Sequence, residues 1–312
     1  MNWVNEMETR ERKKQRAGML MTLLGGIFWG FSGCCGQFMF QHQWVDAKWL
    51  VNMRLLLAGL ILIIIGFIKD GRGQLQIWKK RNDVFRMALF AVCGVTMSQY
   101  TYFMTVQASN AGTATILQYL YPSLILIIVC AREIRGPKPS ETGAILLSLA
   151  GTFVLGTHGD VTQLHLAKEA LVYGLLSAAA GVLYTMLPGQ LITRYGVCQV
   201  LGYGMVLGGA LMLPVVQPWT YSICWTPPLI LSLAGAIILG SAGAYGLYLM
   251  GVSLVGPLKG GLIASVEPVA ALVISVVWLK TRMEQMDILG FFMIFTAVIL
   301  LSLRKPEAEK KR

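Results

Sequence analysis

Charged residues are scarce in this chain. Asp, Glu, Lys and Arg make up only 13% of its 312 residues, whereas hydrophobic residues make up 55%. Soluble globular domains carry about 25% charged residues. This scarcity, together with a mean hydropathy of +0.63, argues against an ordinary soluble protein and predicts a polytopic membrane protein.

Several motifs of enzymes and metal proteins are also missing. The six cysteines show no CxxC spacing, so we expect neither a zinc site nor a disulfide framework. The Gly-rich stretches contain no GxxxxGKS or GxxxxGKT pattern, which argues against an ATP-driven step. No Ser/His/Asp or His/Glu cluster is visible, and the three histidines have no spaced ligand partners. We therefore expect no metal, no cofactor and no enzymatic activity.

The chain lacks long polar segments, and what it has instead is a series of apolar runs. Hydropathy predicts an all-α fold of ten transmembrane helices, joined by connections too short to form a soluble domain. The first run exceeds 20 residues, too long for a cleaved signal peptide. The predicted spans are 17–38, 48–68, 87–106, 110–131, 140–157, 169–188, 198–215, 228–250, 258–279 and 286–303.

Basic residues lie in the short segments between these runs. With the N-terminus inside, the inner segments hold 21 Lys and Arg and the outer segments hold 4. This asymmetry predicts that both termini of this multi-pass protein are cytoplasmic. The net charge of +11 therefore reports topology, and we expect no nucleic-acid partner.

Internal similarity divides the chain into two halves. An offset of 146 residues lays Gly94 on Gly240 and Pro122 on Pro268. We expect a tail at 1–16, one repeat at 17–160, a second at 161–303 and a basic tail at 304–312. Each repeat has five spans, an odd number, so the second is inverted relative to the first. Inverted repeats are typical of secondary transporters, whose substrate sites lie near the membrane midplane at the repeat interface.

Glu267 lies inside the ninth predicted span, next to Pro268. An acidic side chain at that depth is costly and favours a functional role. A buried carboxyl group favours its protonated form, so Glu267 is the candidate for coupling transport to protons. The alternative is a neutral acid held by a neighbouring helix. The 146-residue offset pairs Glu267 with Tyr121, so only one half carries an acid.

Aromatic and amide side chains recur at helical spacing on several spans, which predicts a central cavity for an amphipathic metabolite. Helix packing and an interfacial aromatic belt are the alternative explanation. Arg54 either binds an anionic group or has a structural role, which we favour. Pro122, Glu133 and Pro268 are also expected to be structural, Glu133 through ion pairs with Arg132 and Arg135. The candidate cavity residues are Trp29, Gln37, Gln99, Tyr102, Gln118, Tyr121, Tyr184, Tyr245, Tyr248 and Glu267.

These motifs resemble a known family. The series from Gly94 through Tyr102 and Gly112 to Pro122, with Gly240, Tyr248 and Glu267-Pro268 in the second half, is similar to the EamA domain of the drug/metabolite transporter superfamily. Arg54 matches the family's second-span arginine. The resemblance implies a ten-helix inner-membrane carrier that commonly exports amino acids or related compounds. One departure is that Leu279-Lys280 stands where the first copy has Glu133.

We therefore expect a secondary transporter that exports small metabolites, most plausibly amino acids, by alternating access. Its partners would be a small-molecule substrate, the lipid bilayer and protons. A multidrug or organic-cation efflux carrier is the alternative, because a carboxylate among aromatic rings suits a lipophilic cation. A membrane-embedded enzyme or a sensor is a remote third hypothesis. No sequence pattern sets the oligomeric state.

Overall fold

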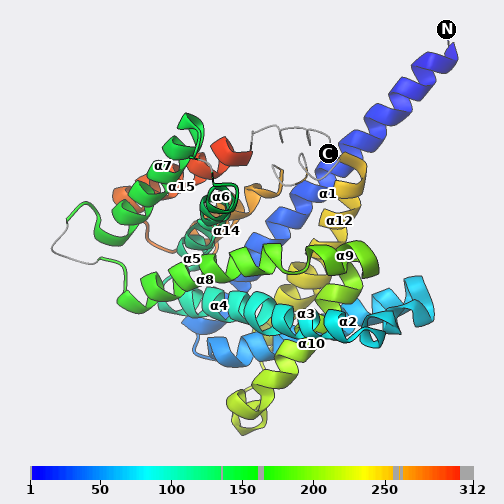
Figure 1. Ribbon diagram of the computed structural model, residues 1–312. Coiled ribbons are helices and arrows are strands. Elements are labelled where there is room, and N and C mark those ends of the chain that lie inside the picture. The colour runs from blue at the N-terminus through cyan, green and yellow to red at the C-terminus, as the bar shows by residue number, and fades with distance from the viewer. Residues whose placement is uncertain (1, 135, 161–164, 256–259, 261–262, 303–312) are drawn as a thin grey trace.

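The computed structural model describes residues 2–134, 136–160, 165–255, 260 and 263–302. Within these residues every regular element is a helix, which confirms the all-α prediction. The helices gather around the second half of α1, whose N-terminal half projects from the bundle (Figure 1). The predicted N-terminal tail at 1–16 is helical from Asn2 onward, as the first part of α1.

The helices follow the predicted apolar runs closely, and several runs are divided into shorter elements. The basic segment between the second and third runs is itself a 3-10 helix, η1. The first half comprises α1 (Asn2–Gln41), α2 (Ala47–Asp70), η1 (Gly71–Lys79), α3 (Arg81–Leu89), η2 (Phe90–Thr96), α4 (Met97–Ala108), α5 (Ala111–Gln118), α6 (Tyr121–Arg132) and α7 (Pro139–Thr157). The second comprises α8 (Lys168–Met186), α9 (Gly189–Tyr195), α10 (Val197–Val216), η3 (Pro218–Thr220), α11 (Pro227–Ala234), η4 (Gly235–Gly243), α12 (Ala244–Val255), α14 (Val266–Val277) and α15 (Gln285–Ser302).

Six helical stretches in the described part of the chain are long and apolar enough to cross a membrane. The α2 helix illustrates how such a stretch meets both protein and lipid. Leu57, Leu60 and Ile64 are exposed along one side, whereas Leu55 and Ala58 are buried on the other. Because lipid chains accept apolar side chains as readily as a protein core does, this outward leucine face fits a bilayer. Three shorter apolar helices lie at 141–157, 266–277 and 285–300.

Helices of the two halves pack against each other in a regular scheme. The closest pairs are α2 with α10, α1 with α12, α4 with α8, and α7 with α15. The α1–α12 pair joins the first predicted span of the first half to the third predicted span of the second half. The α4–α8 pair makes the same contact with the halves exchanged, because α4 belongs to the third span of the first half and α8 to the first span of the second. Such reciprocal contacts are what a two-fold relation between repeats produces.

Local distortions also recur at the 146-residue offset. The π-helical segment η2 lies at Phe90–Thr96, and its counterpart η4 lies at Gly235–Gly243. The helix break between α5 and α6 falls at 119–120, and the helix of the second half is interrupted at Ser265. Pro122 and Pro268 follow these two breaks. A proline near the start of a helix needs no backbone partner for its nitrogen, so both prolines suit helix restarts.

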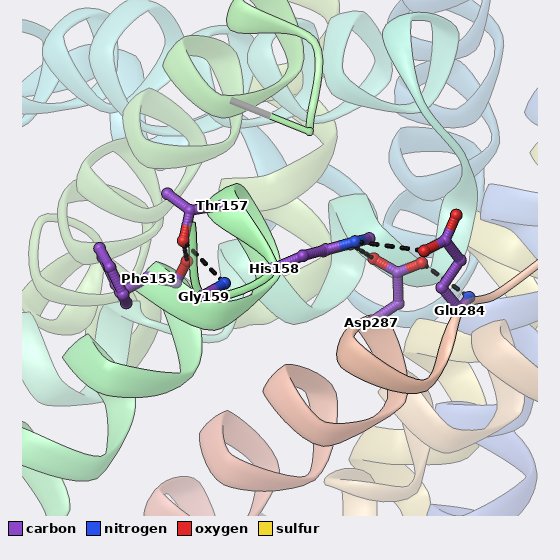
Figure 2. Close-up of polar contacts among 6 residues, drawn as sticks. All are labelled: Phe153, Thr157, His158, Gly159, Glu284 and Asp287. Carbon is purple, nitrogen blue, oxygen red and sulfur yellow. Dashed lines mark hydrogen bonds and ion pairs between the residues drawn. The ribbon is translucent and has the colours of Figure 1, made fainter. Parts of the chain in front are cut away.

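The α7 and α15 helices form a pair joined along its length. Gly151 and Gly290 face each other so closely that a Cβ on either would lie 2.8–2.9 Å from the other's carbonyl oxygen. Beyond the glycines, the His158 ring lies between two carboxylates of the α15 start, Asp287 at 2.8 Å and Glu284 at 3.4 Å (Figure 2). Asp287 also accepts the Glu284 backbone N–H, at 2.9 Å. Small residues along the helices and charges at one end thus hold the pair together.

Candidate functional site

A cavity of about 380 Å³ lies between the two halves. It is bordered by helices of both repeats, as expected for a site at a repeat interface. The lining also reaches the α8–α9–α10 connection through Pro188, Ile192 and Val197. The other lining residues are Trp29, Arg54, Phe90, Ser98, Gln99, Tyr102, Gln118, Tyr119, Tyr121, Gly181, Tyr184, Thr185, Leu201, Tyr245, Tyr248 and Glu267.

Glu267 is positioned by the helix interruption before it. It lies in the first turn of α14, where free backbone N–H groups favour a negative charge. Its Oε2 atom accepts a hydrogen bond of 2.9 Å from the Tyr119 hydroxyl, which comes from the equivalent break in the first half. The two broken helices therefore meet across the repeat interface through an acid and a phenol.

Gln118 is the best-anchored amide in the lining. Its Nε2 atom donates to the Ser177 hydroxyl at 2.9 Å and to the Ser98 hydroxyl at 3.2 Å. These bonds connect α5 to α8 and α4, and they use the amide's donors. The carbonyl oxygen of Gln118 makes no hydrogen bond among the described residues, so it is available as an acceptor.

Aromatic rings form one wall of the cavity. The Trp29 ring lies 5.2 Å from that of Tyr245 and 5.1 Å from that of Tyr248, centroid to centroid. The hydroxyls of Tyr184 and Tyr245 are hydrogen-bonded at 2.7 Å. Tyr102 is buried, and its hydroxyl forms a hydrogen bond of 2.9 Å with the Thr115 hydroxyl. This wall offers ring faces to apolar or cationic groups and holds most hydroxyls in place.

Arg54 also lines the cavity, although we favoured a structural role for it. Its Nε donates to the Ser241 hydroxyl at 3.2 Å and its Nη2 to the Gly240 carbonyl at 3.3 Å. Both partners belong to η4, so the π-helical segment positions the guanidinium. The ring of Phe103 lies beneath it, with 5.1 Å between the guanidinium carbon and the ring centroid. Arg54 thus combines anchoring contacts with a place at the cavity.

Gln37 departs from the predicted set, because it lies outside this lining. It is buried near the C-terminal end of α1. Its Oε1 accepts from the Ala111 backbone N–H and from the Ser275 hydroxyl, both at 2.9 Å, and its Nε2 donates to Thr281 at 2.8 Å. Ser275 and Thr281 are themselves 2.7 Å apart. We call these four residues the Gln37 network; it joins the two halves at one end of the bundle.

The structural candidates have mixed outcomes. Pro122 and Pro268 lie in the first turns of α6 and α14, as helix restarts require. Glu133 ends α6, but the expected ion pair involves Arg135, which lies outside the described residues. The remaining nine predicted cavity residues, from Trp29 to Glu267, all lie in the one lining.

Sequence reasoning missed Tyr119, the partner of Glu267. Helical spacing points to Gln118 and Tyr121 as neighbours on α5 and α6, but the break at 119–120 turns Tyr119 toward the second half. It also missed Phe90, which belongs to the distorted segment η2. The sequence signal for the break was the proline that follows it, Pro122, which the 146-residue offset pairs with Pro268; the direction of the Tyr119 side chain has no such signal.

Comparison with known proteins decides the family. The sequence profile of the EamA-like transporter family matches residues 16–157 and again 168–303. The chain belongs to this family. The transporter of Salmonella typhimurium strain LT2 called "Uncharacterized inner membrane transporter YicL" is 36% identical over 289 residues, covering 92% of this chain and 96% of its own. The predicted family and the prediction of a membrane transporter are therefore confirmed.

Two more distant proteins agree with this assignment. The Bacillus subtilis strain 168 protein called "Uncharacterized transporter YcbK" is 22% identical over 316 residues, covering 98% of this EamA-family chain and 100% of its own. A solved crystal structure matches this chain with a TM-score of 0.58 at 17% identity. It covers 91% of this chain and 96% of its own. That likeness establishes a shared fold.

Proposed function

We propose that this EamA-family transporter exports amino acids or related small metabolites by alternating access, and that Glu267 couples export to protons. The single observation that carries the proposal is the cavity between the halves, which brings the acid, an anchored amide and an aromatic wall together. Such a lining suits a small molecule with both polar and apolar parts.

The proposal includes a topology. Hydropathy and internal similarity suggest ten spans in two inverted repeats, and the Lys and Arg asymmetry suggests that both termini are cytoplasmic. In that arrangement the α8–α9–α10 connection is cytoplasmic and the Gln37 network lies at the opposite face. The cavity would then load from the cytoplasm, which agrees with export.

Glu267 suits proton coupling because the site can accommodate both of its protonation states. As a carboxylate it accepts the Tyr119 hydrogen bond, and as a neutral acid it no longer needs a counter-charge in the bilayer. A proton arriving from outside would therefore exchange with the substrate at the same site.

Flux measurements in proteoliposomes test this proposal. With an imposed proton gradient, wild-type protein should accumulate an amino acid, and Glu267→Gln should lose the response to the gradient. Glu284→Gln is the matched control, since Glu284 is a glutamate with a 75% exposed side chain outside the lining. Gradient-dependent flux that survives in Glu267→Gln would contradict the coupling role. Absence of any amino-acid flux in the wild type would contradict the proposed function itself.

A further inference from the structure

The cavity contains a cation whose hydrogen-bonding capacity is only partly used. Arg54 is 95% buried, since its relative exposure is 5%. A guanidinium has five N–H donors. Its bonds to the Ser241 hydroxyl and the Gly240 carbonyl engage Nε and Nη2, and both acceptors are neutral. In the described part of the chain, Nη1 has no hydrogen-bond partner, while the side chain borders the cavity.

Arg54 also lacks an anionic partner within the described residues. The ion pairs found there involve His158 and Arg194, and none joins Arg54 to a carboxylate. Glu267 lines the same cavity but is hydrogen-bonded to Tyr119. A buried charge in a membrane protein is normally paired, because an unpaired one is costly. When Glu267 is ionised, the cavity therefore presents two opposite charges that no ion pair joins to each other.

We propose that the cavity binds a zwitterion, with its anionic carboxylate on Arg54 and its cationic ammonium near Glu267. The inference rests on the proposed function only in taking this cavity as the transport site. A planar guanidinium fits a carboxylate through parallel N–H bonds. An ammonium group at the other pole has the Glu267 carboxylate and the ring faces of the aromatic wall as partners. Apolar parts of the cargo lie against the rings of Trp29, Tyr245 and Tyr248.

The same geometry disfavours a lipophilic monocation as cargo. Such a cation would satisfy Glu267 but would place a second positive charge beside Arg54, whose burial strengthens the repulsion between the two charges. A monoanion would meet the converse difficulty at Glu267. Only a molecule carrying both charges satisfies both residues at once, so Arg54 is the residue that separates zwitterions from organic cations.

Thermal stabilisation of the purified full-length protein tests the proposal by binding alone. The twenty protein amino acids are screened first. Each one that stabilises the wild type is then compared with the amine that lacks its carboxylate and with the acid that lacks its ammonium group. We expect the zwitterion to bind about tenfold or more tighter than either counterpart, because each counterpart leaves one charge unpaired.

Variants assign the two poles. Arg54→Gln should weaken the zwitterion about tenfold or more and leave its amine counterpart unaffected or bound more tightly, whereas Glu267→Gln should spare the acid counterpart. Arg54→Lys keeps the charge without the fork and should give an intermediate loss. Arg132→Gln, which removes an exposed arginine at the end of α6 outside the lining, is the matched control. If Arg54→Gln does not fold, the wild-type comparison still decides.

Two outcomes would overturn the proposal. One is that none of the amino acids stabilises the wild type. The other is that an amine counterpart binds as tightly as its zwitterion. Either can occur while the protein still carries some other metabolite in flux assays, so the zwitterion inference can fail without the transporter function failing. Conversely, tight zwitterion binding with no flux would contradict transport and leave the binding inference standing.

Discussion

Gly240 shows how one missing side chain supports the cavity. An added Cβ at this position would lie 2.2 Å from the Ser32 Cβ and 2.3 Å from its hydroxyl oxygen. Ser32 is buried and donates to the Ala236 carbonyl at 3.3 Å, so it has little room to move. The Gly240 carbonyl is also an acceptor for Arg54. Close approach of α1 to η4 therefore fixes the position of the guanidinium.

We predict that Gly240→Ala lowers the free energy of unfolding by about 1–3 kcal/mol, the usual cost of overpacking a filled site. It should also weaken substrate binding, because Arg54 loses its placed acceptor. Gly246→Ala is the matched control, since a Cβ there meets nothing within 4 Å. The control should be neutral or slightly stabilising, by up to about 1 kcal/mol. Thermal unfolding in detergent measures both, and equal midpoints for the two variants would contradict the argument.

At this scale the sequence predicted side-chain faces better than depths. Helical spacing correctly brought Trp29 to the cavity, and it put Gln37 on the same face of α1. That periodicity says which face of the helix a side chain is on, but not how far along the helix it lies. Gln37 is about two turns beyond Trp29 on α1 and lies past the end of the cavity. Tyr119 was missed because a break in the helix changes the direction of a side chain, and regular spacing assumes an unbroken helix.

The elements of the two halves share their irregularities as well as their lengths. Hydropathy located most of the long apolar helices, because burial in lipid requires long apolar runs, but it missed the polar start of α1 and the short helices η1 and α9. It could not predict the π-helical segments η2 and η4, which depend on contacts between helices. Both segments contribute to the site: η2 places Phe90 in the lining, and η4 supplies both acceptors of Arg54. Such π-helical insertions often accompany functional sites.

The α3 and α9 helices are joined by a buried carboxylate, close to the end of the cavity that Ile192 and Val197 border. The Asp83 carboxylate accepts from the Tyr195 hydroxyl at 2.7 Å and from Arg194 Nη1 at 3.1 and 3.2 Å. Asp83 precedes the predicted third span and lies outside it. The Tyr195 hydrogen bond, followed by the Arg194 charge, holds the pKa of Asp83 below its usual value.

This lowered pKa predicts an acid-dependent loss of stability. Because the folded pKa of Asp83 lies below the unfolded one, its contribution is fully present above the unfolded value, about 3.9, and is lost as pH falls through the folded value. Asp83→Asn should therefore lower the unfolding midpoint at neutral pH, and its difference from wild type should vanish in strong acid. A pH series of thermal unfolding measures this. Glu169→Gln, an exposed acid in the first turn of α8, should show no such dependence.

At the scale of the whole molecule, the two ends of the cavity differ. One end reaches the α8–α9–α10 connection, whereas the Gln37 network stands at the other end and joins α1 to α5 and α14. Beside the Gln37 network, the rings of Phe31 and Phe38 stack on the Trp278 ring, with centroid distances of 5.7 and 5.2 Å. A transporter that alternates must break such contacts on one side while it forms others. Under the proposed topology and alternating access, the Gln37 network would close the outer face in this conformation.

Gln37→Ala should therefore favour the conformation that opens at this end. Gln37 makes three hydrogen bonds in the network, each worth about 1 kcal/mol, so the ratio of open to closed protein should rise roughly fivefold if one bond's worth is lost and about a hundredfold if all three are. A reporter cysteine at Gln99, which lines the cavity, is introduced after the native cysteines are replaced. Labelling in oriented vesicles with a membrane-impermeant maleimide should come chiefly from the α9 side in the parent, and Gln37→Ala should add labelling from the opposite side. Gln107→Ala is the control, because the hydrogen bond that Gln107 makes among the described residues, from the Ala47 N–H, lies within the first half. If both variants label alike, or if the parent labels equally from both sides, the network does not hold the outer face closed.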